Sequence, residues 1–514
     1  MVDLIYLVEI TAYNPATPGT TTLRYSSGLG KMTGPSETPA DAHYSPRLMQ
    51  PIGFKRTMFS TARVSGGATV GAGEIVLNNT DQGLVALRTY GIDGRDVVVR
   101  IGPQTAAYPA GYTTVLTGTA EQAVVGARDA TIRLRDKMHV LTLPIQATLY
   151  LGNNVLPAGA EGVAEDIKGL RKPILFGRRY QISPVTVNTA RLIYQFHDGV
   201  ASAVDAVYDQ GVALVAGVNR ASLAAMEATA PAAGAYDTCL SLGLIRLGAS
   251  AAGRVTMDAR GDATGSYVNT AGAIVSRILT QRCGISSGDL SAATFTALDS
   301  ASPYEIGVYI TGDTTRQAAI DEVLAGCGGW LAPTRAGLWQ VGQLIAPASP
   351  TFAFTDVDTL AIDTIAPRDA EAGLPVWRVK IRGKQYTPID RADLAGAVTE
   401  ARKAELVQPW RDATSSDATV QTTYLLAPEM ERETPIQALA DLATEAARLL
   451  TLHKVRRDYV QVRVALTQAN AAVDLGSVVS LTTARLGYSA GRNFVVVAID
   501  ADGKRSRLTL DLWG

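Results

Sequence analysis

Short stretches in which apolar and polar residues alternate recur along most of this chain. In residues 131–135, for example, Ile132 and Leu134 alternate with polar neighbours. A period of two buries one face of a strand and exposes the other. The 48 glycines and 23 prolines are spread between these stretches, as is typical of the turns of a β-rich chain. The pattern therefore predicts a fold dominated by strands.

The first 145 residues are predicted to form a β domain, either a small barrel or a sandwich. The alternation expects strands at residues 4–10, 20–25, 74–77, 96–101, 113–118, 121–126 and 131–135. Residues 29–50 interrupt this pattern, because they are rich in Gly, Ser, Thr and Pro and hold little that could form a core. Long loops in compact domains are usually functional or disordered, so we expect this one to reach a neighbouring subunit.

Residues 146–370 are predicted to form a mixed α+β region. We expect helices at 221–230, 270–282 and 314–325; Asp313 or Thr314 is the predicted N-cap of the last, which ends at Gly326. Expected strands lie at 172–181, 190–196, 204–208 and 212–215, and residues 330–342 are expected to form a hairpin.

Residues 371–514 return to the strand pattern, with one helix predicted at 435–453. Thr434 is its expected N-cap and Pro435 its first residue. Expected strands lie at 376–381, 459–466, 478–481, 494–499 and 508–513, with a hairpin turn at 501–504. The whole chain is thus predicted to be a β-rich α+β multidomain protein, divided at 1–145, 146–370 and 371–514.

Composition narrows the classes of partner. The 514 residues include 47 basic and 48 acidic side chains, a net charge of -1, so no strong basic field exists to hold nucleic acid by its phosphates. The three cysteines are widely spaced with no CxxC pair, which argues against a disulfide framework or a zinc site. The first residues lack a basic region before their apolar run, and no apolar stretch is long enough for a membrane helix. We expect folding in a reducing cytoplasm, without a signal peptide or a membrane segment.

Candidate catalytic groups are few, and each has a simpler structural explanation. His197 is the histidine that precedes a carboxylate, Asp198, but no GxSxG elbow accompanies it, so we expect a turn histidine held by local hydrogen bonds. The acids Asp258 and Asp262 alternate as calcium ligands do, but they lack the loop length and terminal Glu of such a site. A solvated turn is expected there. The acidic cluster at 205–209 resembles paired glycosidase carboxylates only if it faces a cleft, and sequence does not show such a cleft.

Three further clusters are interpreted in the same way. Glu429–Glu433 is expected to be a negative run before a helix N-terminus. The Gly-rich residues 65–73 lead into a strand and not a helix, so they are expected to be a plain loop. Two basic groups are expected to be the solvated ends of a strand and of a helix: Lys172, Arg178 and Arg179, and Lys454, Arg456 and Arg457. The sequence therefore predicts no catalytic, cofactor-binding or metal-binding residue, and no cofactor.

An ordered set of segments touches most of the chain, and none of them is a catalytic signature. They are residues 45–47, 73–78, 172–177, 195–199, 204–211, 304–309, 328–330, 338–341, 474–481 and 492–497. Together these segments resemble the tail hub proteins of long-tailed, siphovirus-like bacteriophages, the central hubs of baseplates and tail tips.

The resemblance implies an architecture and a set of partners. Such hubs are typically trimers in which each subunit supplies two tube-like β-barrels, so that three subunits match a hexameric tail tube. The chain is then expected to have two small barrels flanking the α+β middle region and to line a DNA channel at the virion tail tip after assembly in the host cytoplasm. Expected partners are the distal tail ring protein, the central fibre or spike and the tape-measure protein, with DNA only in transit. Alternatives are a tail-tip cell-wall hydrolase or glycan-binding adhesin, the distal tail ring protein itself, and the hub of a related injection system.

Overall fold

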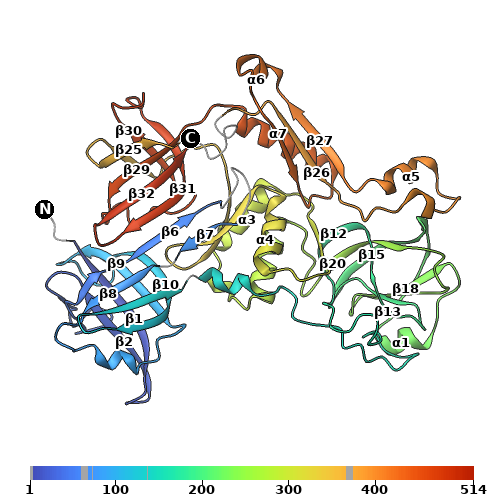
Figure 1. Ribbon diagram of the computed structural model, residues 1–514, viewed down its shortest axis with the longest axis horizontal. Coiled ribbons are helices and arrows are strands. Elements are labelled where there is room, and N and C mark those ends of the chain that lie inside the picture. Colours follow the sequence, from blue (N-terminus) through green and yellow to red (C-terminus); the bar gives the residue numbers. More distant parts are fainter. Residues whose placement is uncertain (1–3, 60–66, 72, 136, 366–373) are drawn as a thin grey trace.

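The computed structural model describes residues 4–59, 67–71, 73–135, 137–365 and 374–514. Its β-rich α+β architecture confirms the predicted fold class. In Figure 1 two strand-rich lobes lie one above the other on the left, and a mixed lobe lies on the right. Helices α3 (Ala292–Ala301) and α4 (Arg316–Ala325) lie between them, and a sheet with α7 (Leu439–His453) lies above.

The first lobe is a seven-stranded antiparallel sheet that curls into a small barrel. Its ends meet at Ser45: Ser26 of β2 donates its N–H to the Ser45 carbonyl at 2.8 Å, and β5 begins at Leu48 and pairs with β8 at the opposite end of the sheet. We call this the first barrel. In sheet order its strands are β2 (Gly19–Ser26), β1 (Leu4–Asn14), β9 (Asp96–Pro103), β10 (Thr113–Val125), β11 (Asp129–Arg135), β8 (Glu74–Asn78) and β5 (Leu48–Gln50).

The interior of the first barrel is a packed core. Alternate residues of its strands, such as Val8, Ile75 and Val99, have no exposed surface. Barrels of this size hold just enough space for their own side chains. The first barrel is therefore a solid unit and not a pore.

The second lobe is built around a six-stranded sheet that we call the second barrel. Its two end strands, β24 and β25, are joined by the turn at residues 356–358, where Asp358 donates its N–H to the Thr355 carbonyl and its side chain accepts the N–H of Thr355 at 2.9 Å. The two end strands are therefore consecutive in the chain and lie close together at this turn. In order the strands are β24 (Phe352–Thr355), β30 (Val478–Thr482), β31 (Arg492–Asp502), β32 (Arg507–Trp513), β29 (Tyr459–Ala465) and β25 (Thr359–Thr364).

One hairpin leaves the first barrel and joins the second. Strand β6 (Gly53–Thr57) pairs with β31, from Gly53 opposite Asp502 to Thr57 opposite Ala498, and also pairs with β7 (Thr69–Gly71). Figure 1 shows both strands reaching from the blue lobe toward the red one. The two barrels are therefore connected by strand pairing as well as by the chain between them.

The middle region contains two five-stranded sheets and a helical layer. Helix α4 contacts α2 (Ala271–Arg277) and the hairpin strand β22 (Gly329–Pro333), which pairs with β23 (Trp339–Gln343). One sheet is β16 (Val212–Ala213), β15 (Ala201–Asp209), β20 (Val255–Asp262), β12 (Ile174–Ile182) and β21 (Gly307–Ile310). The other is β13 (Val185–Asn188), β14 (Ile193–Gln195), β19 (Leu244–Leu247), β18 (Ala235–Cys239) and β17 (Val215–Asn219), with α1 (Leu223–Ala228) beside β18.

A three-stranded sheet completes the fold above the middle region. Strand β26 (Arg378–Gly383) lies between β27 (Arg411–Ser416) and β28 (Glu429–Glu433), and α7 packs on β26 and β27. Val379 and Ile381 have no exposed surface on the helix side. Two short helices lie in the connections: α5 (Glu400–Val407), which with residues 384–411 we call the arm, and α6 (Ala418–Thr423).

Three local predictions were wrong. Helix α7 begins at Leu439 with Ala438 at its N-cap, not at Pro435, because Thr434 and Ile436 continue as extended chain, with Thr434 donating to Arg382 and Ile436 bridging Ile306. Helix α4 is capped by Thr315, whose hydroxyl accepts the Ala318 N–H at 3.2 Å. The two strands expected at 113–118 and 121–126 are one strand with a bulge at residues 120–122.

The predicted long loop at residues 29–50 is more ordered than its composition indicated. It contains β3 (Lys31–Met32), β4 (His43–Tyr44) and β5, and Tyr44 is fully buried. The Tyr44 hydroxyl donates to Glu9 at 2.7 Å, so the segment covers the outer face of β1. The tip stays exposed, with Leu29 at 88% and Met32 at 60% of their full surface. Its contact with a neighbouring subunit remains a prediction.

Candidate functional site

His197 lies in the interior and does not belong to a catalytic arrangement of described residues. Its Nδ1 accepts the N–H of Leu175 at 3.1 Å, and its Nε2 lies 3.9 Å from Asp262. Asp262 in turn forms an ion pair with Arg277 at 2.5 Å. Burial lowers the pKa of His197 to about 4, because the interior disfavours the charged imidazole. Among the described residues no Ser, Thr or Cys side chain is hydrogen-bonded to it. The expected local hydrogen bond was wrong, since Leu175 is 22 residues away.

Asp258 and Asp262 lie on strand β20 and not in a solvated turn, so that prediction was also wrong. Both are buried, at 8% and 4% exposure. Asp258 accepts the Gln181 N–H at 2.8 Å and the Tyr208 hydroxyl at 3.0 Å. These donors satisfy the carboxylate within the protein, while burial raises its pKa.

The remaining acidic clusters are paired with basic residues. Asp205 contacts Arg178 at 2.9 Å and Arg260 at 3.1 Å. Glu429–Glu433 forms strand β28 instead of a run before a helix, because its register with β26 sets glutamates opposite Arg378, Lys380 and Arg382. No contact joins these glutamates to His197 within the described part of the chain.

The two basic groups divide between surface and interior. Arg179 was expected at a solvated strand end, but it is 8% exposed and donates to Gln385 at 2.8 Å. Lys454 follows α7 and contacts Asp417 at 3.2 Å, and Arg457 lies 4.7 Å from the centre of the Trp513 ring. Of the Gly-rich residues 65–73, residues 65, 66 and 72 lie outside the described ranges and residues 69–71 form β7.

Metal chemistry and membrane spanning find no support in the described residues. Within those ranges, no three His, Cys, Asp or Glu side chains are grouped to hold a metal ion. Cys239 and Cys327 are buried, Cys283 is half-buried, and all three are free thiols. No helix in the described ranges has the length and apolar character needed to cross a bilayer.

The most concentrated polar site is a buried junction between the two barrels. Arg56 lies on strand β6, which pairs with β31 of the second barrel. Its side chain is 1% exposed and contacts Asp474 at 2.6 Å. Arg335, in the turn between β22 and β23, is 3% exposed and donates its main-chain N–H to the same carboxylate at 2.7 Å. We call this set the inter-barrel junction. Asp474 thus connects the β6–β7 hairpin to the turn between β22 and β23 of the middle region.

The Arg335 side chain extends this junction into both barrels. It donates to the carbonyl of Val115 in the first barrel at 2.9 Å and to that of Val473 beside the second barrel at 2.7 Å. Its guanidinium lies 5.1 Å from the centre of the Phe54 ring, within the range of a cation–π contact. Burial lowers the pKa of Arg335 to about 10. A planar fork with several donors suits this role, and it fixes the relative position of the lobes.

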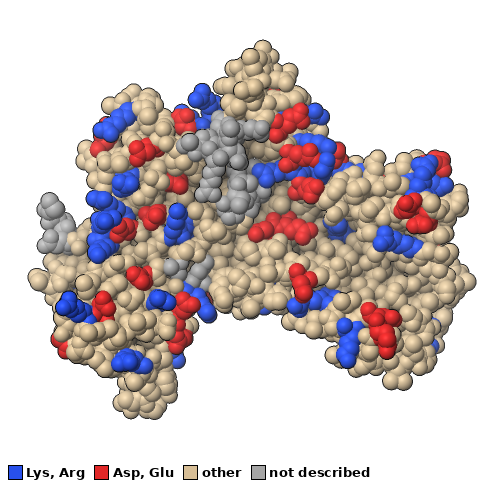
Figure 2. Space-filling view, in the orientation of Figure 1, with Lys and Arg blue, Asp and Glu red and all other residues tan. Residues whose placement is uncertain are grey.

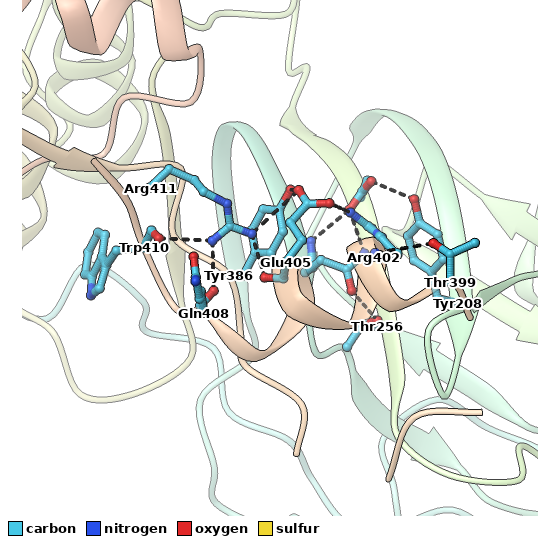
Figure 3. Close-up of polar contacts among 11 residues, drawn as sticks. Tyr208, Thr256, Tyr386, Thr399, Arg402, Glu405, Gln408, Trp410 and Arg411 are labelled. Carbon is cyan, nitrogen blue, oxygen red and sulfur yellow. Dashed lines mark hydrogen bonds and ion pairs between the residues drawn. The ribbon is translucent and has the colours of Figure 1, made fainter. Parts of the chain in front are cut away.

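A second network attaches the arm to the middle region (Figure 3). Glu405 of α5 accepts the Tyr386 hydroxyl at 2.8 Å and Arg402 at 2.6 Å. Arg411 lies 4.3 Å from the centre of the Tyr386 ring, and Arg402 lies 5.6 Å from that of Tyr208 on β15. Stacking on aromatic rings lets these arginines bridge two elements while keeping polar partners.

The arm also has an apolar core of its own beside Gly211. This core comprises Tyr386, Ile389, Leu394, Val398 and Leu406. Gly211 has a φ of +83°, and a Cβ there would lie 3.0 Å from both Leu394 and Leu406. The close approach therefore requires glycine.

The sequence did not reveal either junction. Arg56 and Asp474 are 418 residues apart, and Arg335 stands in what reads as an ordinary hairpin turn. A single arginine in a turn is usually solvated, so no local signal marks these residues.

Comparison with known proteins identifies phage tail proteins as similar structures. A tail protein from Neisseria meningitidis MC58 is 11% identical, with 99% of this chain and 96% of that chain covered and a TM-score of 0.38. The 43 kDa tail protein of prophage MuSo2 from Shewanella oneidensis is 10% identical, with 92% and 96% covered and a TM-score of 0.39. The prophage tail protein gp18 from Listeria monocytogenes is 9% identical, with 99% and 94% covered and a TM-score of 0.39. No protein-family model and no curated protein matches the chain. Each TM-score is below 0.5 and each identity is below 25%, so these likenesses assign no role to the chain.

Proposed function

We propose that this chain is a structural hub of a phage tail tip, which joins the tail tube and distal tail ring to the central fibre or spike. The observation that carries the proposal is the pair of small barrels held together by the β6–β7 hairpin, which pairs with β31, and by the inter-barrel junction. A component that transmits load between rings needs its ring-forming units in a fixed relation, and the junction supplies this.

The packed barrel interiors support a channel between subunits and not one through a single barrel. Since side chains fill each barrel, DNA in transit would pass along the outer surfaces of barrels from several copies. Closed rings require repeated interfaces related by symmetry, and we propose a trimer in which six barrels surround the channel. The near-neutral charge of -1 suits a surface that DNA passes without being retained. The tape-measure protein is a further proposed partner, and the proposed location is the virion tail tip.

We propose domains at residues 1–145, 146–370 and 371–514. Strands β6 and β7 of the first range and β24 and β25 of the second pair into the second barrel. We also propose a non-enzymatic role. Asp258 accepts hydrogen bonds from Gln181 and Tyr208, and His197 accepts the N–H of Leu175. Both side chains are buried away from solvent.

Symmetry of the assembled particle tests this proposal. Cryo-electron microscopy of particles that contain this chain is expected to show it in a threefold layer next to a sixfold tube, with two barrels per subunit around the axis. A sixfold layer with one chain per position would favour a distal ring, and a lone monomer off the axis would reject the hub. Clearing of purified peptidoglycan by the chain, lost on His197→Asn or on Glu429→Gln with Glu431→Gln, would assign a hydrolase instead.

A further inference from the structure

The three-stranded sheet of β27, β26 and β28 has an open edge at β28. Strand β28 is parallel to β26, and no strand within the described ranges pairs on its other side. Thr434 donates its N–H to the Arg382 carbonyl, which fixes the pairing pattern of this parallel ladder. The main-chain N–H and C=O groups of Met430 and Arg432 therefore face β26. The main-chain groups of the three glutamates, Glu429, Glu431 and Glu433, face away from β26.

The solvent face of this sheet carries charge in rows. The central row on β26 is basic, with Arg378, Lys380 and Arg382, and the edge row on β28 is acidic, with Glu429, Glu431 and Glu433. Arg382 contacts Glu431 at 2.5 Å, and Lys380 contacts Asp412 of β27 at 3.0 Å. Figure 2 shows acidic and basic side chains side by side below the uncharged knob at the top of the molecule, where Figure 1 places α6.

The glutamate row keeps capacity for further cations. The side chains of Glu429, Glu431 and Glu433 are 51%, 47% and 58% exposed. Cross-strand pairs of opposite charge stabilise neighbouring strands, whereas like charges oppose pairing. A strand added beside β28 would therefore place basic residues against this row.

We propose that the β28 edge receives an extended segment of a partner protein in which Lys or Arg occupies alternate positions. Edge strands with free main-chain groups bind partners by strand addition, where main-chain hydrogen bonds supply affinity and alternate side chains supply specificity. In β28 the outward N–H and C=O groups are available for main-chain hydrogen bonds, and the glutamate row is available to select the side chains of the partner. This inference goes beyond the hub proposal and does not depend on it.

The proposed partner is a different protein and not a second copy of this chain. The described edge strands carry no alternating basic residues; they include β7, β13, β16, β17, β21, β24, β25 and β27. Leu425 and Leu426, just before β28, are 85% and 81% exposed. They would contact an apolar residue at one end of the added segment.

Peptide binding to the full-length chain tests the proposal. The probe is a fluorescent peptide in which lysine and valine alternate, with a peptide of the same composition in two blocks as its comparison. Binding of the alternating peptide alone is expected, measured by fluorescence anisotropy at low salt and weakened at high salt. Hydrogen exchange on the unaltered chain should show protection of the Glu431 amide when this peptide is added.

A proline at the edge separates strand addition from charge attraction. Glu431→Pro removes an outward N–H, which an edge strand tolerates, and is expected to weaken the peptide at least about tenfold by loss of main-chain pairing. Thr414→Pro is the matched control, because the Thr414 N–H faces away from β26 at the opposite edge, and it should bind as the unaltered chain does. Glu431→Gln should show an intermediate loss with the fold intact.

Three results would overturn the inference: equal binding of the two peptides, equal loss in the two proline variants, or no protection of Glu431 in the unaltered chain. Self-association abolished by Glu431→Pro, without peptide binding, would assign the edge to a second copy and also reject the proposal.

Discussion

Replacing Asp474 by asparagine tests whether the inter-barrel junction holds the two barrels together. The change keeps the size of the side chain and removes one negative charge. In the native chain this carboxylate contacts Arg56 at 2.6 Å and accepts the main-chain N–H of Arg335 at 2.7 Å. Both arginines are at most 3% exposed, so the variant leaves two buried guanidinium groups without the carboxylate that offsets them.

The expected loss is about 3 kcal/mol in the free energy of unfolding. Removing one partner of a buried ion pair costs about 3–5 kcal/mol, since the remaining charge stays desolvated. Asp474 is 17% exposed, which allows some water to approach and favours the lower end. The double variant Asp474→Asn with Arg56→Met should recover part of the lost free energy of unfolding, because it also removes one of the two buried positive charges.

Urea unfolding followed by tryptophan fluorescence measures this loss. Trp330 is a local reporter, because a Cβ at Gly476 would lie 3.0 Å from its ring. Asp81→Asn is the matched control, since the Asp81–Arg47 pair has similar geometry but Asp81 is 57% exposed. A smaller loss than that of Asp474→Asn is expected for this exposed pair, because water screens its charges.

Equal losses in Asp474→Asn and in the control would refute the reasoning, since burial would then not matter. A loss without recovery in the double variant would show that the carboxylate acts through its hydrogen bonds to the main chain and not through the charge of Arg56.

Three further predictions concern the middle region and the arm. Gly177→Ala should lower the free energy of unfolding by about 1–3 kcal/mol or more, because φ is +63° and the new Cβ would lie 1.8 Å from a carbonyl oxygen. Gly169→Ala is the control, since φ there is +81° but the space is open. Thermal unfolding should show a smaller loss of stability for this control. The pKa of His197 is about 4 against about 6.5 unfolded, so the unfolded chain binds more protons between these values. Stability present above pH 6.5 is then lost as pH falls toward 4, by up to about 3 kcal/mol, and His197→Asn should flatten this dependence in pH-stepped urea unfolding. Glu405→Gln should speed proteolytic cleavage of the arm, whereas Glu400→Gln, at a side chain 69% exposed, should leave cleavage unchanged.

Helices and strands with strong local signals were predicted well. The alternation at 131–135 and at 459–466 marks β11 and β29, and the hairpin at 330–342 is β22 and β23. The errors came where a distant partner changes the local preference. Thr434 and Pro435 look like a helix start, but Thr434 bonds to Arg382 and Ile436 bridges Ile306, so the helix begins later.

The candidate residues show the same division between local and long-range information. Alternating acids at Asp258 and Asp262 look like a wet turn, yet β12 and β15 pair on both sides of β20 and bury them. Glu429–Glu433 looks like a negative run before a helix, but parallel pairing with β26 makes it an edge strand. In both cases the side chains alone do not reveal which strand lies beside them.

The sequence by itself determined the β-rich class, the positions of the strands and helices with strong periodicity, and the lack of a strong charge field, because periodicity and composition are local properties. Only the tertiary structure decided that the sheet of the first barrel closes on itself, that β6 pairs with β31 in the other barrel, and that Arg56, Arg335 and Asp474 meet. These contacts join residues up to about 450 positions apart, and any strand edge can pair with many others until the whole chain packs. The physical selection is made by burial of the complete core, which no single segment encodes.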